Sequence, residues 1–274
     1  MAADGSGVVA MRGGSARISH SARTDVGRVR SVNEDALLAE APVYLVADGM
    51  GGHARGDAAS RAVVDTFRRH LAAGSVSTPE QVLDAIHSSN EAVRSLSHEG
   101  EEGTAVAGTT LAGVVLVDAG DGRGVHWMVF NVGDSRVYAW NGRRLEQVTV
   151  DHSAVQELVD AGLISASDAE RHPDRNVITR ALGADEVAEP DVWLIPAAGR
   201  QVFLVCSDGL SKEVDDDGIA RILAGDTGHG AGLAGELVEA ALEHGGRDNV
   251  TAVVVESELD GSDPGETPRG AGAA

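Results

Sequence analysis

Residues 43–53 read VYLVADGMGGH, a short apolar run that passes directly into an aspartate and a series of glycines. A run of this length bounded by a turn is typical of a buried β-strand. The strand would bring Asp48 to its end, with Gly49 directly behind it. Glycine lets the backbone come close to a ligand, so this strand end can present both a carboxylate and a backbone carbonyl to a cation.

Three more aspartates lie close to glycine at strand ends. Asp134 follows Gly133 after the run 129–132, Asp208 precedes Gly209 after 201–206, and Asp248 is separated from Gly246 by Arg247 just before 250–256. One such aspartate most often only belongs to a turn, but four at strand ends indicate a shared cleft. Hard divalent cations prefer oxygen ligands, so an aspartate-rich set favours Mg²⁺ or Mn²⁺ over Zn²⁺.

Strand and helix patterns alternate around these strand ends. Asn141-Gly142 predicts a hairpin between two of the strands. We expect strands over 43–47, 109–117, 125–132, 135–140, 144–149, 192–196, 201–206 and 250–256, and helices over 56–70, 79–96, 153–161, 167–172, 219–223 and 233–244. Strands interleaved with helix pairs predict an α+β layered sandwich rather than a doubly wound parallel sheet.

The two ends of the chain are rich in small and polar residues, with little to bury. We therefore expect one catalytic domain over residues 16–258, with residues 1–15 and 259–274 disordered.

The amino-acid composition limits which partners the protein can bind and in which cellular compartment it can function. Lys and Arg number 22 against 43 Asp and Glu, a formal charge of −21, which disfavours nucleic acid and anionic membranes as partners. Cys206 is the single cysteine, so no internal disulfide forms and a reducing compartment fits. No stretch resembles a secretory signal or a membrane span. We expect a cytoplasmic protein, with a monomer as the default.

The chain resembles the type 2C (PPM) metal-dependent serine/threonine protein phosphatases over roughly residues 18–255. Five motifs follow the order and spacing of that family, and the segment His172–Gly183 is similar to the flap of its bacterial members. The motifs are Gly27-x-x-Arg30-x-x-Asn33-Glu34-Asp35, Asp48–His53, Gly133-Asp134-Ser135-Arg136, Ser207-Asp208-Gly209 and Gly246-Arg247-Asp248-Asn249-Val250-Thr251. The resemblance implies a four-layer α-β-β-α sandwich, in which two stacked, mainly antiparallel sheets are flanked by helices.

The resemblance also implies a pair of central metal ions. Asp48 corresponds to the carboxylate that bridges both ions, and Gly49 would offer its carbonyl to one of them. Asp208 and Asp248 would complete the shell of the other.

Further positions surround that pair in the family. Asp134 resembles the ligand of a third ion, shared with Asp208. Glu34 and Asp35 would lie at the edge of the cluster and hold metal-bound waters. Arg30 resembles the guanidinium that clamps the substrate phosphate, and its alternative role is a surface ion pair with Glu34.

These assignments agree with the chemistry of phosphate ester hydrolysis. Two cations about 3.5–4 Å apart can hold a water, lower its pKa and offset charge on the phosphoryl oxygens. The planar fork of Arg30 matches phosphate oxygens, and no covalent phosphoenzyme is required. Substrates would be phosphorylated proteins, by resemblance serine/threonine kinases and their targets.

The group that protonates the leaving oxygen stays open at this stage. Some members of the family carry a histidine directly after the Asp-Gly, where this chain has Met50. His53 is a candidate general acid, and its alternative role is to cap the following helix.

Other phosphatase and hydrolase chemistries fit the sequence less well. A thiol phosphatase needs Cys-x5-Arg, but Lys212 stands at that distance from Cys206. The residues 215–217 have the letters of an aspartyl-phosphate motif without a preceding apolar strand, which favours a helix-capping turn. His152 lies between Asp151 and Ser153, and sequence neighbours rarely form a triad.

A non-catalytic binding protein with the same fold is the alternative from another functional class. The presence of Asp48, Asp208 and Asp248 together argues against it, because a decayed site would be expected to lose these ligands.

Overall fold

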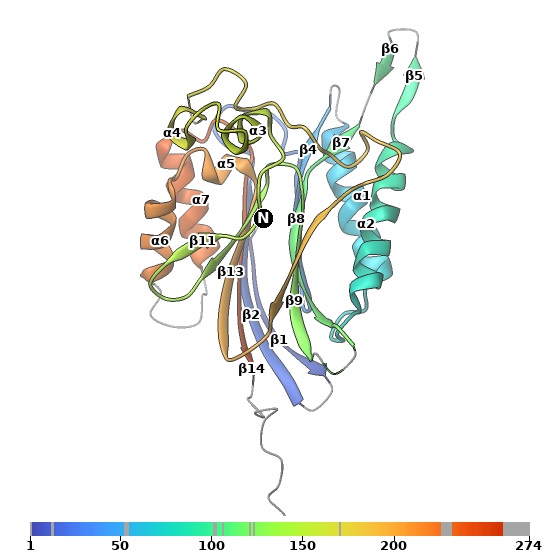
Figure 1. Cartoon of the computed structure of the whole chain (residues 1–274), viewed down its shortest axis with the longest axis vertical. Coiled ribbons are helices and arrows are strands. Elements are labelled where there is room, and N and C mark those ends of the chain that lie inside the picture. Colours follow the sequence, from blue (N-terminus) through green and yellow to red (C-terminus); the bar gives the residue numbers. More distant parts are fainter. Residues whose placement is uncertain are drawn as a thin grey trace, which may run out of the picture.

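The computed structural model describes residues 2–11, 14–51, 55–100, 103–105, 107–120, 122, 124–169, 171–225 and 232–259. Two β-sheets pack face to face at its centre, and helices cover the outer face of each sheet (Figure 1). The pairings between neighbouring strands are antiparallel. The predicted α-β-β-α sandwich is therefore confirmed.

The first sheet has the strand order β1-β2-β14-β13-β10-β11, and helices α5, α6 and α7 lie on its outer side. Its strands are β1 (Ala2–Met11), β2 (Gly14–Asp25), β10 (Arg136–Trp140), β11 (Leu145–Gln147), β13 (Arg200–Cys206) and β14 (Val250–Leu259). Its helices are α5 (Asp208–Ser211), α6 (Asp216–Ala224) and α7 (Leu233–His244).

The second sheet has the order β12-β9-β8-β4-β3, with β7 paired to β4, and α1 and α2 cover it. Its strands are β3 (Asp35–Glu40), β4 (Val43–Met50), β7 (Gly108–Thr109), β8 (Leu111–Asp118), β9 (Val125–Val132) and β12 (Asp191–Pro196), and its helices are α1 (Gly56–His70) and α2 (Pro79–Arg94). A small separate pair consists of β5 (His98–Gly100) and β6 (Gly103–Ala105). The short helices α3 (Ala154–Asp160) and α4 (Ala166–Ala169) lie above one end of the sheets (Figure 1).

Strand β4 shows why the sequence at 43–47 is apolar at every position. Tyr44 and Val46 point into the layer between the two sheets, whereas Leu45 and Ala47 face α1 and α2. Both faces of the strand are buried, so the alternation of polar and apolar residues typical of a half-exposed strand is lost. In the central layer the rings of Trp127 and Phe203 lie 5.5 Å apart and join the two sheets.

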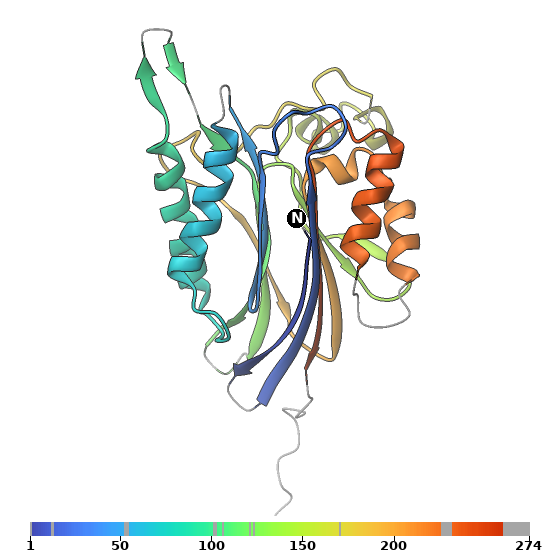
Figure 2. The ribbon, with the colours of Figure 1, turned by 180° about the vertical axis from the view of Figure 1, so that it is seen from behind.

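The N-terminal segment differs from the sequence expectation. Residues 1–15 are predicted to be disordered, yet β1 pairs with β2 from Ala2↔Arg23 to Met11↔Gly14 (Figure 2). The backbone ladder supplies this order, and Val9, which is completely buried, anchors the strand in the central layer. A glycine-rich composition hides such a strand because pairing with a neighbour, rather than side-chain pattern, specifies it. The domain therefore extends to residue 2.

Other differences concern β2 and β3. The sequence pattern predicts neither β2, which carries many polar residues and pairs with the distant β14, nor β3, a strand of six residues that pairs with its neighbour β4. The predicted helices over 56–70 and 233–244 are confirmed with the same bounds. Of the predicted disordered segment 259–274, Leu259 is the last residue of β14 and 260–274 lie outside the described residues. Within the described chain, no helix combines the length and apolarity needed to cross a bilayer.

The neighbours Val8 and Val9 provide a test of β1. Val9 is completely buried, whereas Val8 is 64% exposed. Val9→Asp should lower the free energy of unfolding by about 3 kcal/mol or more, because it places a carboxylate in the apolar central layer. Val8→Asp should change it by less than about 0.5 kcal/mol. Urea denaturation of both variants measures the difference, and equal stabilities would show that residues 2–11 are not a strand of the sheet.

Candidate metal centre and active site

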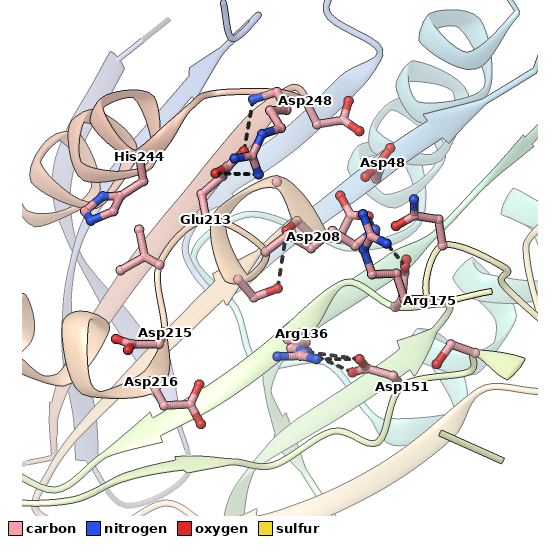
Figure 3. Close-up of a pocket in the computed structure, with 18 of the residues that line it drawn as sticks. Asp48, Arg136, Asp151, Arg175, Asp208, Glu213, Asp215, Asp216, His244 and Asp248 are labelled. Atoms are coloured by element: carbon pink, nitrogen blue, oxygen red, sulfur yellow. Dashed lines mark hydrogen bonds and ion pairs between the residues drawn. The ribbon is translucent and has the colours of Figure 1, made fainter. Parts of the chain in front are cut away.

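The four predicted strand-end aspartates meet at one end of the sandwich. Asp48 lies in β4 of one sheet, Asp208 follows β13 and Asp248 precedes β14 in the other, and Asp134 lies in the turn that crosses from β9 to β10. All four line a single groove of about 1670 Å³. Figure 3 shows Asp48, Asp208 and Asp248 gathered at one part of this groove. The structure thus brings together residues from both sheets, as expected.

The carboxylates of this cluster repel one another strongly. Burial raises the pKa of Asp48 well above its usual range, and Asp35, Asp208, Asp134 and Asp248 raise it further. Burial, together with Asp208, likewise raises the pKa of Asp134 to about 7. Positive charge at this place would relieve the repulsion and return these groups to their ionised forms.

The free oxygens of the cluster fit hard divalent cations. The Oδ1 atoms of Asp35, Asp134 and Asp208 are buried and have no hydrogen-bond partner among the described residues. Such atoms are costly unless something binds them, and carboxylate oxygen is the ligand that Mg²⁺ and Mn²⁺ prefer. Among the described residues, no three His, Cys, Asp or Glu side chains could enclose one ion by themselves. Backbone carbonyls and water would therefore complete any coordination shell, as is usual for Mg²⁺.

The position of Gly49 is compatible with such a carbonyl ligand. Gly49 lines the groove directly after Asp48, and its backbone N–H donates to the Glu34 carbonyl over 3.1 Å. A Cβ at this position would lie 2.0 Å from the Gly56 carbonyl oxygen, so only glycine fits between the two segments.

Arg30 lies over the cluster in the exposed loop between β2 and β3. Its Nη2 donates to Asp248 Oδ2 over 2.8 Å, and about half of its side chain is exposed. Asp248 is also the main cause of the raised pKa of Arg30. The alternative role for Arg30 was a surface ion pair with Glu34. In the structure Arg30 pairs instead with Asp248, a candidate metal ligand. The remaining guanidinium nitrogens are available to an anion in the groove.

Asp35 and Glu34 occupy different positions beside the cluster. Glu34 lines the groove, whereas Asp35 is buried behind it, where its Oδ2 accepts hydrogen bonds from Ser207 Oγ at 2.9 Å and Thr251 Oγ1 at 2.6 Å. Burial raises the pKa of Asp35 to about 7, although both hydroxyls favour its ionised form. The two hydroxyls tie β3 of one sheet to β13 and β14 of the other.

Asn249 positions the loop that carries Arg30, a role that the sequence reasoning did not assign. Its Oδ1 accepts from the Glu34 backbone N–H at 2.8 Å, and its Nδ2 donates to the carbonyls of Val26 and Val32 at 2.9 and 3.0 Å. The side chain is buried, so these three bonds hold residues 26–34 against the start of β14. The position of Asn249 directly after Asp248, within the same motif, could have indicated a role in the site.

Lys212 is a second residue that the sequence reasoning missed as part of the site. It follows α5, and its ammonium donates to Asp208 Oδ2 and lies 3.8 Å from Asp134 Oδ2. The spacing of four residues from Asp208, one helical turn, could have indicated the first contact. The contact with Asp134 depends on the pairing of β10 with β13, which places the residue before β10 beside those that follow β13.

His53, the candidate general acid, lies outside the described residues. The assignment of the group that protonates the leaving oxygen therefore stays a prediction.

The competing chemistries are not supported by the positions of their residues. The thiol of Cys206 is completely buried, and this burial raises its pKa to about 12, so it is a poor nucleophile. Asp215 caps α6 by accepting from Gly218 N at 2.8 Å, as predicted.

The three neighbours of the possible triad have separate partners. His152 Nδ1 accepts from the Gly133 N–H at 3.0 Å, next to Asp134. Asp151 pairs with Arg136 at 2.7 Å, and Ser153 caps α3. His152 therefore supports the turn of Asp134 instead of forming a triad with Asp151 and Ser153.

Comparison with known proteins gives consistent matches over most of the chain. Residues 27–226 match the family model described as protein phosphatase 2C. The serine/threonine protein phosphatase PstP of Mycobacterium tuberculosis is 38% identical over 243 residues, which are 87% of this chain and 45% of the relative. The serine/threonine phosphatase stp of Listeria monocytogenes is 34% identical over 249 residues, which are 86% of this chain and 95% of the relative. The chain thus spans less than half of the mycobacterial relative but nearly all of the listerial one.

The fold is also shared with solved structures. The crystal structure of the catalytic domain of PstP in complex with two manganese ions superposes with a TM-score of 0.73 at 34% identity, covering 89% of this chain and 99% of that one.

The role of Asn249 leads to a prediction about the loop of Arg30. Asn249→Ala leaves one buried N–H and two carbonyls without their partner, so the free energy of unfolding should fall by about 2–4 kcal/mol. Hydrogen exchange of residues 26–34 should accelerate in the folded protein. Asn141→Ala, which removes two bonds to backbone N–H groups in an exposed hairpin, is the control and should leave that exchange unchanged. Unaltered exchange of residues 26–34 in Asn249→Ala would contradict the positioning role.

Proposed function

The chain belongs to the protein phosphatase 2C family, and we propose that it hydrolyses phosphoserine and phosphothreonine in proteins by means of divalent metal ions held at its aspartate cluster. The observation that carries the proposal is the convergence of Asp48, Asp208 and Asp248 from two different sheets on one groove, next to Arg30. A cluster with buried, unpartnered carboxylate oxygens suits a metal centre better than it suits a merely structural role.

Two Mn²⁺ or Mg²⁺ ions would be held by Asp48 between them, by Asp208 and Asp248, and by the Gly49 carbonyl. When bound, such ions activate a water for attack on phosphorus and offset the charge of the phosphoryl oxygens. Glu34 and Asp35 would contribute from beside and behind the cluster through water. The manganese-bound structure of the related PstP domain supports two as the number of central ions.

Arg30 would orient the substrate phosphate. Among the described residues, Arg30 has a hydrogen bond to Asp248 alone, and its exposed side chain can turn toward the groove. A guanidinium offers two parallel hydrogen bonds to phosphate oxygens, which fixes the phosphorus atom relative to the cluster. Asn249 keeps the loop of Arg30 in place. The residues just before β14 therefore both carry Asp248 and position Arg30.

The shape of the groove fits a segment of protein as substrate. From the cluster it continues past α3, Arg171 and the flap residue Arg175 to α6 and α7, where Asp216 and His244 line it (Figure 3). A groove of this length can accept residues on either side of a phosphorylated side chain. The names of the related enzymes support phosphorylated serine and threonine as the target. We include serine/threonine kinases and their targets among the proposed substrates, and we propose that a monomer acts on them.

Metal dependence provides the direct test of the function. Hydrolysis of a phosphothreonine peptide should stop in EDTA and return with Mn²⁺, and less strongly with Mg²⁺. Asp48→Asn removes a charge that both central ions share, so turnover should fall about 10³-fold or more, a loss of over ~4 kcal/mol of transition-state stabilisation. The exposed Asp84→Asn on α2 is the control and should keep normal turnover. Full activity in chelator, or a tenth of normal activity in Asp48→Asn, would exclude the proposed centre.

Arg30 is tested by comparison with Arg28 in the same loop. Arg30→Ala should raise KM and lower kcat/KM by roughly 10- to 100-fold, the value of a lost charge-assisted hydrogen bond pair. Arg30→Lys should restore little, since an ammonium cannot form the bidentate contact. Arg28 donates to the Leu242 carbonyl, and Arg28→Ala should leave KM within about twofold. Steady-state kinetics with one phosphopeptide separates these outcomes, and a near-normal Arg30→Ala would return Arg30 to a surface role.

A further inference from the structure

Lys212 is the only lysine among the 274 residues of this protein, and it lies within the aspartate cluster. Every other basic side chain that is permanently charged is an arginine. Lys212 is the residue directly after α5, the short helix that begins at Asp208. Its ammonium therefore reaches back over one helical turn to the carboxylate of Asp208.

The ammonium of Lys212 contacts the two carboxylates that the family resemblance assigns to a third metal ion. It donates to Asp208 Oδ2 and lies 3.8 Å from Asp134 Oδ2. The side chains of Asp134 and Asp208 are only 6% and 12% exposed, so the ammonium is their main neighbour of opposite charge. Within the part of the chain that the structure describes, the Oδ1 atoms of these two aspartates have no hydrogen-bond partner.

We propose that the Lys212 ammonium is a built-in cation that takes the place of a third metal ion between Asp134 and Asp208, so that this protein works with two metal ions. The inference rests on the proposed metal centre, but it concerns a different position. Asp208 would use its two oxygens for different cations, Oδ2 for Lys212 and Oδ1 for a central ion.

Electrostatics gives the physical reason. A divalent ion and an ammonium cannot both occupy the space between the same two oxygens, because like charges this close together repel strongly in a partly buried site. A third ion would have to displace Lys212 into solvent and break its contact with Asp208.

The arrangement also explains how Asp134 is kept in place without a metal. His152 holds the backbone of the Asp134 turn through the Gly133 N–H, and Lys212 offsets the charge of the carboxylate itself. Because Lys212 is covalently attached, this positive charge is present at any metal concentration. A bound third ion would instead depend on the supply of Mn²⁺ or Mg²⁺.

Counting the bound metal ions in charge variants tests the proposal. Isothermal titration with Mn²⁺, combined with paramagnetic resonance of the free ion, should give two ions per chain for the wild type. Lys212→Met should bind a third ion, because Asp134 and Asp208 are then free to hold it. Its affinity for this ion should be at least tenfold higher than any further Mn²⁺ binding of the wild type. Lys212→Arg keeps the charge and should retain two ions.

Arg221 provides the matched control for the loss of one positive charge. It is exposed in the wall of the same groove and donates to the Asp217 carbonyl, away from Asp134 and Asp208. Arg221→Met should therefore bind two ions. In chelator, Lys212→Met should melt at a lower temperature than Arg221→Met, and saturating Mn²⁺ should remove the difference.

The outcomes separate this inference from the proposed activity. A third ion that binds equally well to the wild type and to Lys212→Met would overturn the role of Lys212. A count of two bound ions for both proteins would also overturn it. Binding of a third ion by Arg221→Met would show that net charge, not the position of Lys212, decides the number. Absence of phosphopeptide hydrolysis with the expected ion counts would refute the proposed function alone, whereas absence of any Mn²⁺ binding would overturn both.

Discussion

Mutual repulsion among buried carboxylates is the constraint on which the rest of this structure depends. Asp35, Asp48, Asp134 and Asp208 come close enough that burial and their neighbours raise the pKa of Asp35, Asp48 and Asp134. Such a group is unfavourable in a folded protein unless cations, hydroxyls or N–H groups offset the charge. The two-sheet core, buried on both faces of β4, supplies the stability that holds it together. Because the repulsion between the carboxylates is unfavourable in the folded protein, binding of metal ions relieves it, and this relief favours metal binding.

The cluster exists because the two sheets pack face to face. Each sheet alone brings only some of the aspartates, and the turn from β9 to β10 carries Asp134 between them. Polar side chains then join the sheets at the site. Asp35 accepts hydroxyl groups from Ser207 and Thr251, and Asn249 fastens the loop of Arg30. The polar contacts that position the site are therefore also the contacts that join the two sheets at this end of the sandwich.

Two basic side chains share the candidate ligands in different ways. Arg30 contacts Asp248 from an exposed loop, so it can exchange that contact for a substrate phosphate. Lys212 contacts Asp208 and Asp134 from a more buried position, where it can remain throughout a catalytic cycle. In the proposed mechanism one cation thus serves the substrate, and the other serves the carboxylates. The proposed role of Lys212 is that its fixed positive charge reduces the number of metal ions that the cluster requires.

Sequence alone determined the strands buried on both faces, the amphipathic helices α1 and α7, and the aspartates at strand ends, because each leaves a local pattern in the chain. It did not reveal β1, β2 or β3, whose side chains show no clear strand pattern and whose order comes from backbone pairing within the sheets. It also predicted Asp48, Asp134, Asp208 and Asp248 as one site, but not the part of Lys212 or Asn249. Lys212 meets Asp134 through the pairing of β10 with β13, and Asn249 meets residues 26–34 through the pairing of β14 with β2 together with the packing of the two sheets. Contacts between side chains that are far apart in sequence have no local pattern, so only the tertiary structure decided them.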